Sequence, residues 1–280
     1  LENYWGAYPL RLGNMDLTWE SSEQFDAGFD ARFFNGRLSA NFDFYLKNTK
    51  NWLVQAPILA TAGTDAPFIN GGNVKNTGVE ISLGWNDVIG NDFSYNISVN
   101  GAYNRNRVGS IPTQDGIIHG TTNELYDNAP EYYRAENGHP IGYFWGYKTA
   151  GVFQNQAQIA AWRAAGNGIL QSDPKPGDVI FVDLDHNGTV NDDDKTDLGN
   201  GIPKFTYGVN INLYYKNFDL GIVGVGQVGN KIVQSYRNQG NPKANYTTTI
   251  LDRWTGEGTS NKMPRVTNDN INWQFSDLYL

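Results

Sequence analysis

The chain has 280 residues, a formal net charge of −8 and no cysteine. The acidic balance, without a basic stripe, argues against a nucleic-acid partner, and the lack of thiols excludes disulfide bonds and thiolate metal sites. The sequence holds no apolar run of roughly 18 residues that would predict a membrane-spanning helix. A membrane β-barrel stays open, because its strands alternate between apolar and polar side chains.

Two runs of alternating apolar residues, the first beginning at Trp19, flank Asn35-Gly36. A period of two is typical of a strand with one apolar face, and Asn-Gly between two such runs is a strong hairpin signal. A tight turn at Asn35 and Gly36 keeps every apolar residue on one face. We therefore predict these pairs: Phe33 with Leu38, Ala31 with Ala40, Phe29 with Phe42, Ala27 with Phe44, Phe25 with Leu46, and Trp19 with Trp52.

Two further hairpins follow the same pattern. In the first, residues 79–85 run out and residues 93–99 run back, with apolar side chains on one face and mainly Ser, Asn and Gly on the other. The second turns at Lys216-Asn217. This turn pairs Tyr215 with Phe218, Leu213 with Leu220, and Ile211 with Ile222.

The length of these strands bears on the fold class. The first hairpin predicts strands of about 15 residues, where about 5 or 6 are usual in globular sheets and about 9 to 11 cross a bilayer. Alternation alone does not separate a soluble sandwich from a barrel. Tight turns on one side, much longer connections on the other and aromatic residues near strand ends favour the barrel. These aromatic residues include Trp19, Trp52, Phe33 and Phe34. The fold-class prediction is all-β: part of a large antiparallel transmembrane barrel with long extracellular loops and a short loop helix.

The longest connection, residues 108–202, exceeds the usual loop length so far that it must carry structure of its own. Residues 142–147 are an aromatic strand candidate. Residues 156–165 predict a short helix, because Asn155 is a good N-cap and Gly166 a good stop. We expect this region to be an extracellular loop domain.

Three aromatic residues in the long connection, Tyr132, Tyr133 and Trp145, could stack on sugar rings or other flat ligands. Packing that keeps the loop folded is the simpler interpretation. No catalytic residue is predicted, because no nucleophile elbow, phosphate loop or zinc motif occurs and no histidine has a partner at triad or metal-binding spacing. The three histidines are His119, His139 and His186.

Residues 183–194 have the spacing of a calcium loop. Carboxylate or amide oxygens fall at positions one, three, five, nine and twelve, and position seven, Thr189, can offer its backbone carbonyl. Gly188 stands at the sharp turn in position six. The last position carries Asp194 in place of the usual glutamate, whose longer arm favours bidentate ligation. An acidic solvated turn is the alternative interpretation. The predicted ligands of a structural Ca²⁺ are Asp183, Asp185, Asn187, Thr189, Asn191 and Asp194.

An ordered set of stretches carries a resemblance to a known family: residues 17–20, 73–80, 142–154, 175–178, 183–194, 203–208 and 215–220. Taken together and in order, they resemble the C-terminal half of SusC/RagA-type TonB-dependent outer-membrane transporters. The resemblance implies a barrel of 22 strands in a Gram-negative outer membrane, in contact with its lipid. It also implies an N-terminal plug, energy from TonB and a SusD-like surface lipoprotein that helps capture oligosaccharides or peptides.

By this resemblance the whole of residues 1–280 is barrel sequence, residues 277–280 lie inside a strand, and the plug, the TonB-interacting segment and the closing strands lie outside this sequence. The chain then forms part of an importer and catalyses no reaction. The alternative, from a different class, is a secreted calcium-stabilised β-sandwich that binds carbohydrate or acts as an adhesin.

Overall fold

The computed structural model describes residues 9–56, 58, 60–235, 243–267 and 270–280. The chain divides into two compact units. The first comprises residues 1–118, 135–141 and 202–230, and the second comprises residues 119–134, 142–201 and 231–280. Each unit is described by itself.

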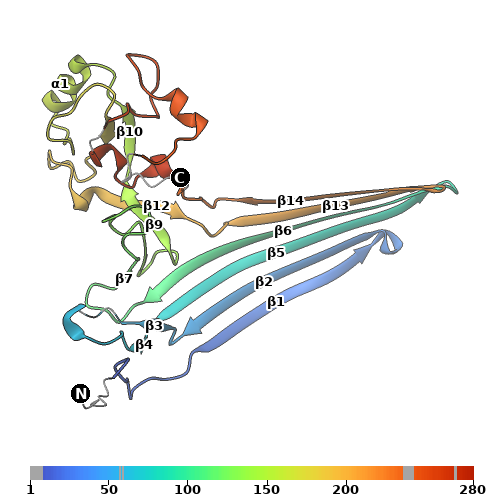
Figure 1. The fold of residues 1–280 in the computed structure, drawn as a ribbon. Coiled ribbons are helices and arrows are strands. Elements are labelled where there is room, and N and C mark those ends of the chain that lie inside the picture. The colour runs from blue at the N-terminus through green and yellow to red at the C-terminus, as the bar shows by residue number, and fades with distance from the viewer. Residues whose placement is uncertain (1–8, 57, 59, 236–242, 268–269) are drawn as a thin grey trace, which may run out of the picture. The chain divides into compact units, whose positions relative to one another are not determined.

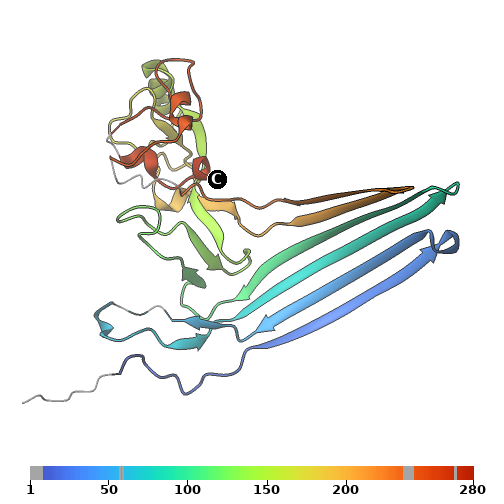
Figure 2. The ribbon, with the colours of Figure 1, turned by 45° about the vertical axis from the view of Figure 1, so that its right-hand side comes forward.

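The first unit is built on one six-stranded antiparallel sheet, whose long strands run side by side in Figures 1 and 2. The strand order is β1-β2-β5-β6-β13-β14. Three hairpins, β1-β2, β5-β6 and β13-β14, make up the sheet. β5 returns beside β2 after residues 51–72, and β13 returns beside β6 after the long connection. The strands are β1 (Ser21–Phe33), β2 (Leu38–Lys50), β5 (Asn73–Ile89), β6 (Phe93–Ser110), β13 (Phe205–Tyr215) and β14 (Phe218–Val228).

The first hairpin has the predicted register, with Phe33 paired to Leu38 and Phe25 to Leu46. At the tip, a short 3-10 element, η1 (Phe34–Gly36), includes positive φ values of 58° at Asn35 and 87° at Gly36. The Arg37 N–H closes the turn by donating to the carbonyl of Phe34 at 3.3 Å. The Asn-Gly prediction is confirmed because these residues tolerate the left-handed backbone that a tight hairpin needs.

The other two hairpins are also confirmed. Trp85 pairs with Ile97 in the second. In the third, Tyr215 pairs with Phe218 around a turn in which Lys216 has a φ of 52°.

The predicted pair of Trp19 and Trp52 is wrong. The ladder of the first hairpin ends at Ser21 and Lys50. Asn51 then takes a φ of 54°, which turns the chain, and Trp52 donates its N–H to the carbonyl of Gly72 at 3.1 Å. The redirected segment forms β3 (Leu53–Gln55), η2 (Ala60–Ala62) and β4 (Phe68–Asn70), with β3 and β4 paired.

A small core in the first unit lies at the end of β6, beyond Tyr103, the last residue of β6 that pairs with β13. Val108 and Ile111 are buried there with Ala135, and Ile118 and Ile141 pack against them. The backbone of β6 continues its pairing here: the Val108 N–H donates to His139 at 2.9 Å and the Gly138 N–H donates to Val108 at 2.8 Å. The short strand β7 (Ile117–His119) follows.

The second unit holds short strands, one helix and the C-terminal turns. Strand β9 pairs with β12 and β8, and β10 pairs with β11. The strands are β8 (Tyr133–Glu136), whose last two residues belong to the first unit, β9 (Tyr143–Tyr147), β10 (Thr149–Val152), β11 (Val179–Phe181) and β12 (Lys195–Asn200). The helical elements are α1 (Gln156–Ala164) and the 3-10 turns η3 (Asp192–Asp194), η4 (Thr248–Asp252), η5 (Asn270–Trp273) and η6 (Asp277–Tyr279).

The predicted loop strand and loop helix are confirmed as β9 and α1. The Asn155 side chain caps α1 by accepting from the Gln158 N–H at 2.9 Å, and Gly166, with a φ of 81°, follows its end. The helix buries Ile159 against Phe153 and Ile180. No helix among the described residues is long and apolar enough to cross a membrane.

The expected strand at residues 277–280 is wrong, because this segment forms the turn η6. Phe275 and Tyr279 bury their rings with Leu198 in the second unit. This packing, together with the hydrogen bond from the Tyr279 hydroxyl to the Trp273 carbonyl at 3.2 Å, favours a compact turn over an extended strand.

Candidate functional site

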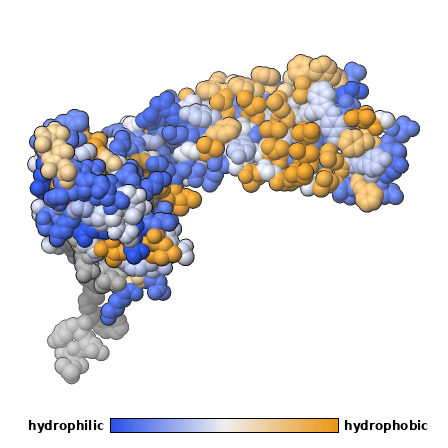
Figure 3. All heavy atoms as spheres, turned by 90° about the horizontal axis from the view of Figure 1, so that it is seen from above, coloured by the Kyte–Doolittle hydropathy of each residue, from blue (hydrophilic) through white to orange (hydrophobic). Residues whose placement is uncertain are grey.

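The six-stranded sheet has one apolar face that no described element covers. Its side chains come from alternate positions of neighbouring strands, as the row Phe29, Phe42 and Ile81 illustrates. Phe29 is 61% exposed and Leu83 is 47% exposed, although both lie in mid-sheet rows. Figure 3 shows apolar side chains gathered along the strands. A soluble sheet would bury such a face, so this face requires an apolar environment.

The height of the apolar face fits a bilayer. It extends from the row of Phe93, Tyr215 and Phe218 near the tight turns to the row of Tyr103 and Phe205. Ten residue steps along β13 correspond to about 34 Å, and a strand tilt of about 45° reduces this to about 24 Å. The apolar band of outer-membrane barrels is about 25 Å tall.

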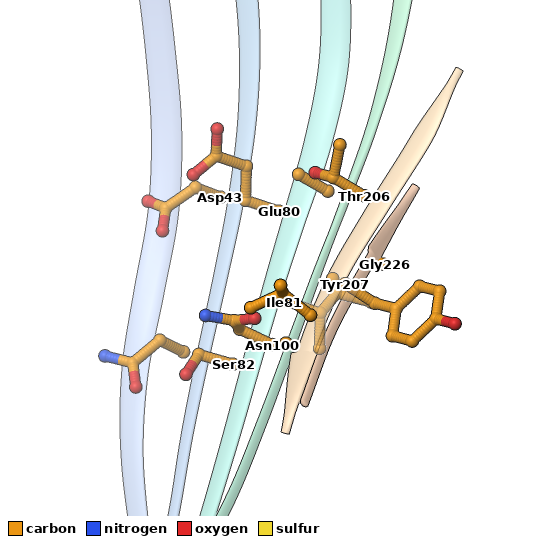
Figure 4. A pocket seen from close by; sticks show the side chains of 13 residues that line it. Asp43, Glu80, Ile81, Ser82, Asn100, Thr206, Tyr207 and Gly226 are labelled. Carbon is orange, nitrogen blue, oxygen red and sulfur yellow. The ribbon is translucent and has the colours of Figure 1, made fainter. Parts of the chain in front are cut away.

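The opposite face of the sheet is polar and hollowed. An open hollow of about 510 Å³ is lined by Asp43, Glu80, Ser82, Asn100 and Thr206, among others. Figure 4 shows these side chains on adjacent strands, while the ring of Tyr207 points away from them. Asp43 and Glu80 are direct partners in the ladder, where two like charges destabilise the sheet unless water or cationic groups screen them. A face of this kind belongs against water or a polar ligand.

The loop at residues 183–194 is the second candidate site. Carboxylate oxygens of Asp183, Asp185 and Asp194 lie within 4.8 Å of one another. Asp183 and Asp194 are buried, whereas Asp185 is exposed. The loop turns through positive φ values of 60° at His186 and 85° at Gly188. Three converging carboxylates are a donor set that hard divalent cations prefer, so these residues fit Ca²⁺.

Backbone donors hold the two buried carboxylates in place. Asp194 accepts from the N–H of Leu184 at 2.6 Å and of Asn191 at 2.9 Å, which ties the start of the loop to its end. Asp183 accepts from Gly188 at 2.8 Å and Gly168 at 3.2 Å. Desolvation acts to raise the pKa of Asp183, but these backbone donors outweigh it and hold the pKa below its usual range.

The other predicted ligands make hydrogen bonds within the loop. The Asn187 amide donates to Asp185 at 2.8 Å, and its oxygen accepts from the Thr189 N–H at 2.8 Å. The Asn191 side chain accepts from the Asp193 N–H at 2.7 Å, as the cap of η3. The contact of Gly168 with Asp183 escaped sequence reasoning, because Gly168 lies 15 residues before its partner and outside the motif.

Comparison with known sequences decides the family. A sequence model of the family described as "TonB dependent receptor-like, beta-barrel" matches residues 2–256.

The chain belongs to the TonB-dependent receptor family of β-barrels.

Among related TonB-dependent receptors, the chain is 30% identical over 261 residues to TonB-dependent receptor P3 of Formosa agariphila, covering 91% of this chain and 25% of that protein. It is 24% identical over 256 residues to TonB-dependent receptor SusC of Bacteroides thetaiotaomicron, covering 89% of this chain and 23% of that protein. The chain thus spans about a quarter of the length of these relatives.

Solved structures agree on the fold. The chain matches the structure of the RagAB peptide transporter with a TM-score of 0.68 at 23% identity, over 91% of this chain and 27% of that one. The RagAB peptide importer in its "open-open" state gives a TM-score of 0.67 at 24% identity, over 91% of this chain and 26% of that one. This TonB-dependent receptor chain is therefore a SusC/RagA-like barrel portion of a Gram-negative outer-membrane protein, and its family is one of transporters and not of enzymes.

The predicted stacking residues of this receptor chain lie in the second unit, within reach of other aromatic or cationic groups. The Tyr132 ring lies 4.9 Å from that of Tyr133 and 5.3 Å from that of Phe275, measured between centroids. Trp145 carries the Arg134 guanidinium over its ring at 4.0 Å. These contacts fit loop packing, and ligand stacking stays a prediction.

Proposed function

We propose that this chain forms part of the wall of an active outer-membrane importer that takes up oligosaccharides or peptides. The observation that carries the proposal is the difference between the two faces of the sheet. One face is apolar over the height of a bilayer, and the opposite face is polar and hollowed. The polar face offers amide, hydroxyl and carboxylate groups, which suit a hydroxyl-rich or amide-rich cargo in a wet lumen. The long connection between β6 and β13 begins and ends at the sheet end opposite the tight turns, as expected for the extracellular side.

The proposed importer works with two partners. A SusD-like surface lipoprotein would help capture cargo outside the cell, and TonB would supply energy through a part of the protein outside this sequence. The resemblance to SusC/RagA-type transporters supports both partners. The proposed role of the loop 183–194 is structural, because Ca²⁺ bound by Asp183, Asp185 and Asp194 would neutralise the three carboxylates and hold the loop in one shape. In the described second unit the loop is flanked by strands and turns, without the helix pair that a calcium sensor opens and closes.

A secreted β-sandwich is not supported by the described sheet. A sandwich covers its apolar face with a second sheet, whereas Phe25, Phe29 and Ile222 remain 60%, 61% and 49% exposed. If the intact protein is soluble and monodisperse without detergent, the importer proposal is wrong.

Uptake by cells tests the transport proposal. Cells that express the intact protein are given a labelled oligosaccharide mixture or a labelled peptide mixture, with and without an uncoupler of the inner-membrane proton gradient. We expect uptake of one class, abolished by the uncoupler and by deletion of TonB. Uptake of neither class, or uptake that persists without TonB, would contradict the proposal. Co-purification with a surface lipoprotein encoded beside the gene tests the partner.

A further inference from the structure

Basic residues occupy the apolar face just beyond its apolar band. Moving away from the tight turns, the row of Tyr103 and Phe205 is followed by Arg105, and the next row brings Lys75 opposite Arg107. The pairing of β5 with β6 is regular from Val74 onward, since the register shift lies between Asn73 and Val74. Alternation along both strands therefore places these three basic side chains on the same face as the apolar band.

The three basic side chains are close enough to share one anion. Lys75 and Arg107 are direct ladder partners, with Cβ atoms about 5 Å apart by sheet geometry, and Arg105 is a diagonal neighbour of Lys75 at about 7 to 8 Å. All three residues are exposed. Arg107 donates from Nη1 to the carbonyl of Gly138, which anchors its guanidinium. The two guanidinium groups and the ammonium carry further N–H donors, which the oxygens of a phosphate can accept.

Among the described residues, neither Lys75 nor Arg105 belongs to an ion pair such as those of Arg37, Lys50 and Arg265. Glu23 is the carboxylate in the same cross-strand row as Lys75 and Arg107, and it forms an ion pair with Lys50 at 2.6 Å. Like charges that face each other across a strand pair destabilise a sheet, so a bound anion would stabilise this arrangement.

We propose that Lys75, Arg105 and Arg107 bind the phosphate of a phosphorylated glycolipid headgroup in the outer leaflet of the outer membrane. The triad lies at the end of the strands opposite the tight turns, which is the outer rim of a barrel of this kind. The guanidinium group of arginine can donate two parallel hydrogen bonds to a phosphate, and basic residues at a membrane surface attract anionic headgroups. The apolar band directly below the triad provides a surface for acyl chains. Because that band continues into the triad, a lipid fits the surface better than a soluble anion.

Lipid titration of the intact transporter tests the proposal. The protein, purified in a neutral detergent, is titrated with diphosphoryl lipid A and with dephosphorylated lipid A of the same acyl chains, and bound lipid is counted by native mass spectrometry. We expect a preference for the phosphorylated form. In the variant Lys75→Gln, Arg105→Gln, Arg107→Gln this affinity should fall about 100-fold, at roughly fivefold for each basic residue lost.

Lys47→Gln is the matched control. Lys47 follows Leu46 on β2 and faces the polar side of the sheet, so its loss removes one positive charge, as each single variant does, without touching the triad. We expect this variant to bind lipid A like the unmodified protein. If the triple variant fails to fold, as judged by heat-modifiable migration, the single variants Lys75→Gln and Arg105→Gln decide, each with about a fivefold loss.

Three results would overturn the proposal. These are equal affinity of the triple variant and the unmodified protein for diphosphoryl lipid A, equal affinity of the unmodified protein for the two lipids, and displacement of the lipid by inorganic phosphate at the same concentration. The last result would identify a soluble-anion site. None of these measurements depends on cargo uptake, so they are independent of the proposed function.

Discussion

Arg265 donates a hydrogen bond from Nε to the buried carboxylate of Asp178 at 2.7 Å, across 87 residues of sequence. The same carboxylate accepts from the Asn272 amide at 2.8 Å and from the Lys175 N–H at 2.8 Å. Asp178 therefore joins two distant segments of the second unit through one charged group that has no access to water. Such a charge is tolerated only while its partners remain in place.

Replacement of Asp178 by Ala should unfold the contact between these segments. Because Arg265 and Asn272 would lose their shared acceptor, we expect a destabilisation of about 3 to 5 kcal/mol in the second unit. Hydrogen exchange of the intact protein should show faster exchange in residues 175–181 and 260–267. Asp173→Ala is the control, since Asp173 is exposed and pairs with Lys175 only at 3.5 Å. Equal exchange in both variants would contradict the role of Asp178.

The calcium content of the purified protein tests whether the loop at residues 183–194 binds Ca²⁺. Asp183→Ala together with Asp185→Ala removes two of the three converging carboxylates, and we expect bound calcium to fall from about one ion per molecule to none. The control is Asp193→Asn, which removes a charge inside the loop from an exposed position that the ligand spacing does not use. Elemental analysis after dialysis measures the difference. Unchanged calcium in the double variant would refute the assignment.

The turn at Gly36 should tolerate no side chain without strain. Its φ of 87° disfavours any residue with a Cβ, although an added Cβ would meet no atom within 4 Å. Gly36→Ala should therefore cost about 1 to 2 kcal/mol from backbone strain alone. Urea-induced unfolding of the intact protein, followed by tryptophan fluorescence, measures the cost. Gly13→Ala, which also meets no atom within 4 Å and has no positive φ, should leave stability unchanged.

Alkaline pH should weaken the packing around Tyr132. Desolvation, followed by a hydrogen bond and repulsion from Glu124, raises the pKa of Tyr132 to about 12 from 10.0. Because the folded protein holds this proton more tightly than the unfolded chain, the stabilising effect is complete below pH 10 and declines as the pH rises toward 12. Tyr132→Phe should reduce the loss of stability between these two pH values in thermal unfolding. An identical decline in the variant would show that other groups cause it.

Local sequence patterns predicted the hairpins of the sheet and the acidic loop at residues 183–194, because neighbouring residues determine both. Period-two alternation and the turns at Asn35-Gly36 and Lys216-Asn217 predict the register of the hairpins, because one apolar face permits only one pairing. The spacing of Asp183, Asp185 and Asp194 likewise predicts that their carboxylates converge.

The contacts between distant segments of the second unit have no local sequence pattern that predicts them. The bonds from Arg265 and Asn272 to Asp178 depend on how the second unit folds, and the turn η6 depends on the burial of Phe275 and Tyr279. The expected pair of Trp19 and Trp52 failed for a related reason. The backbone of Asn51 turns away, and alternation of side chains carries no information about that turn.

The central claim is that the apolar face of the sheet meets lipid and the polar face meets water. Leu83 and Ser82 are neighbours on β5 near the middle of the apolar band, and their side chains lie on opposite faces. Folded, heat-modifiable protein in outer membranes is measured for Leu83→Arg and Ser82→Arg in the intact transporter. The account predicts that Leu83→Arg lowers the folded fraction, at a cost of about 2 to 4 kcal/mol, whereas Ser82→Arg folds nearly as well as the unmodified protein. Equal folding of the two variants, or a larger defect in Ser82→Arg, would contradict it.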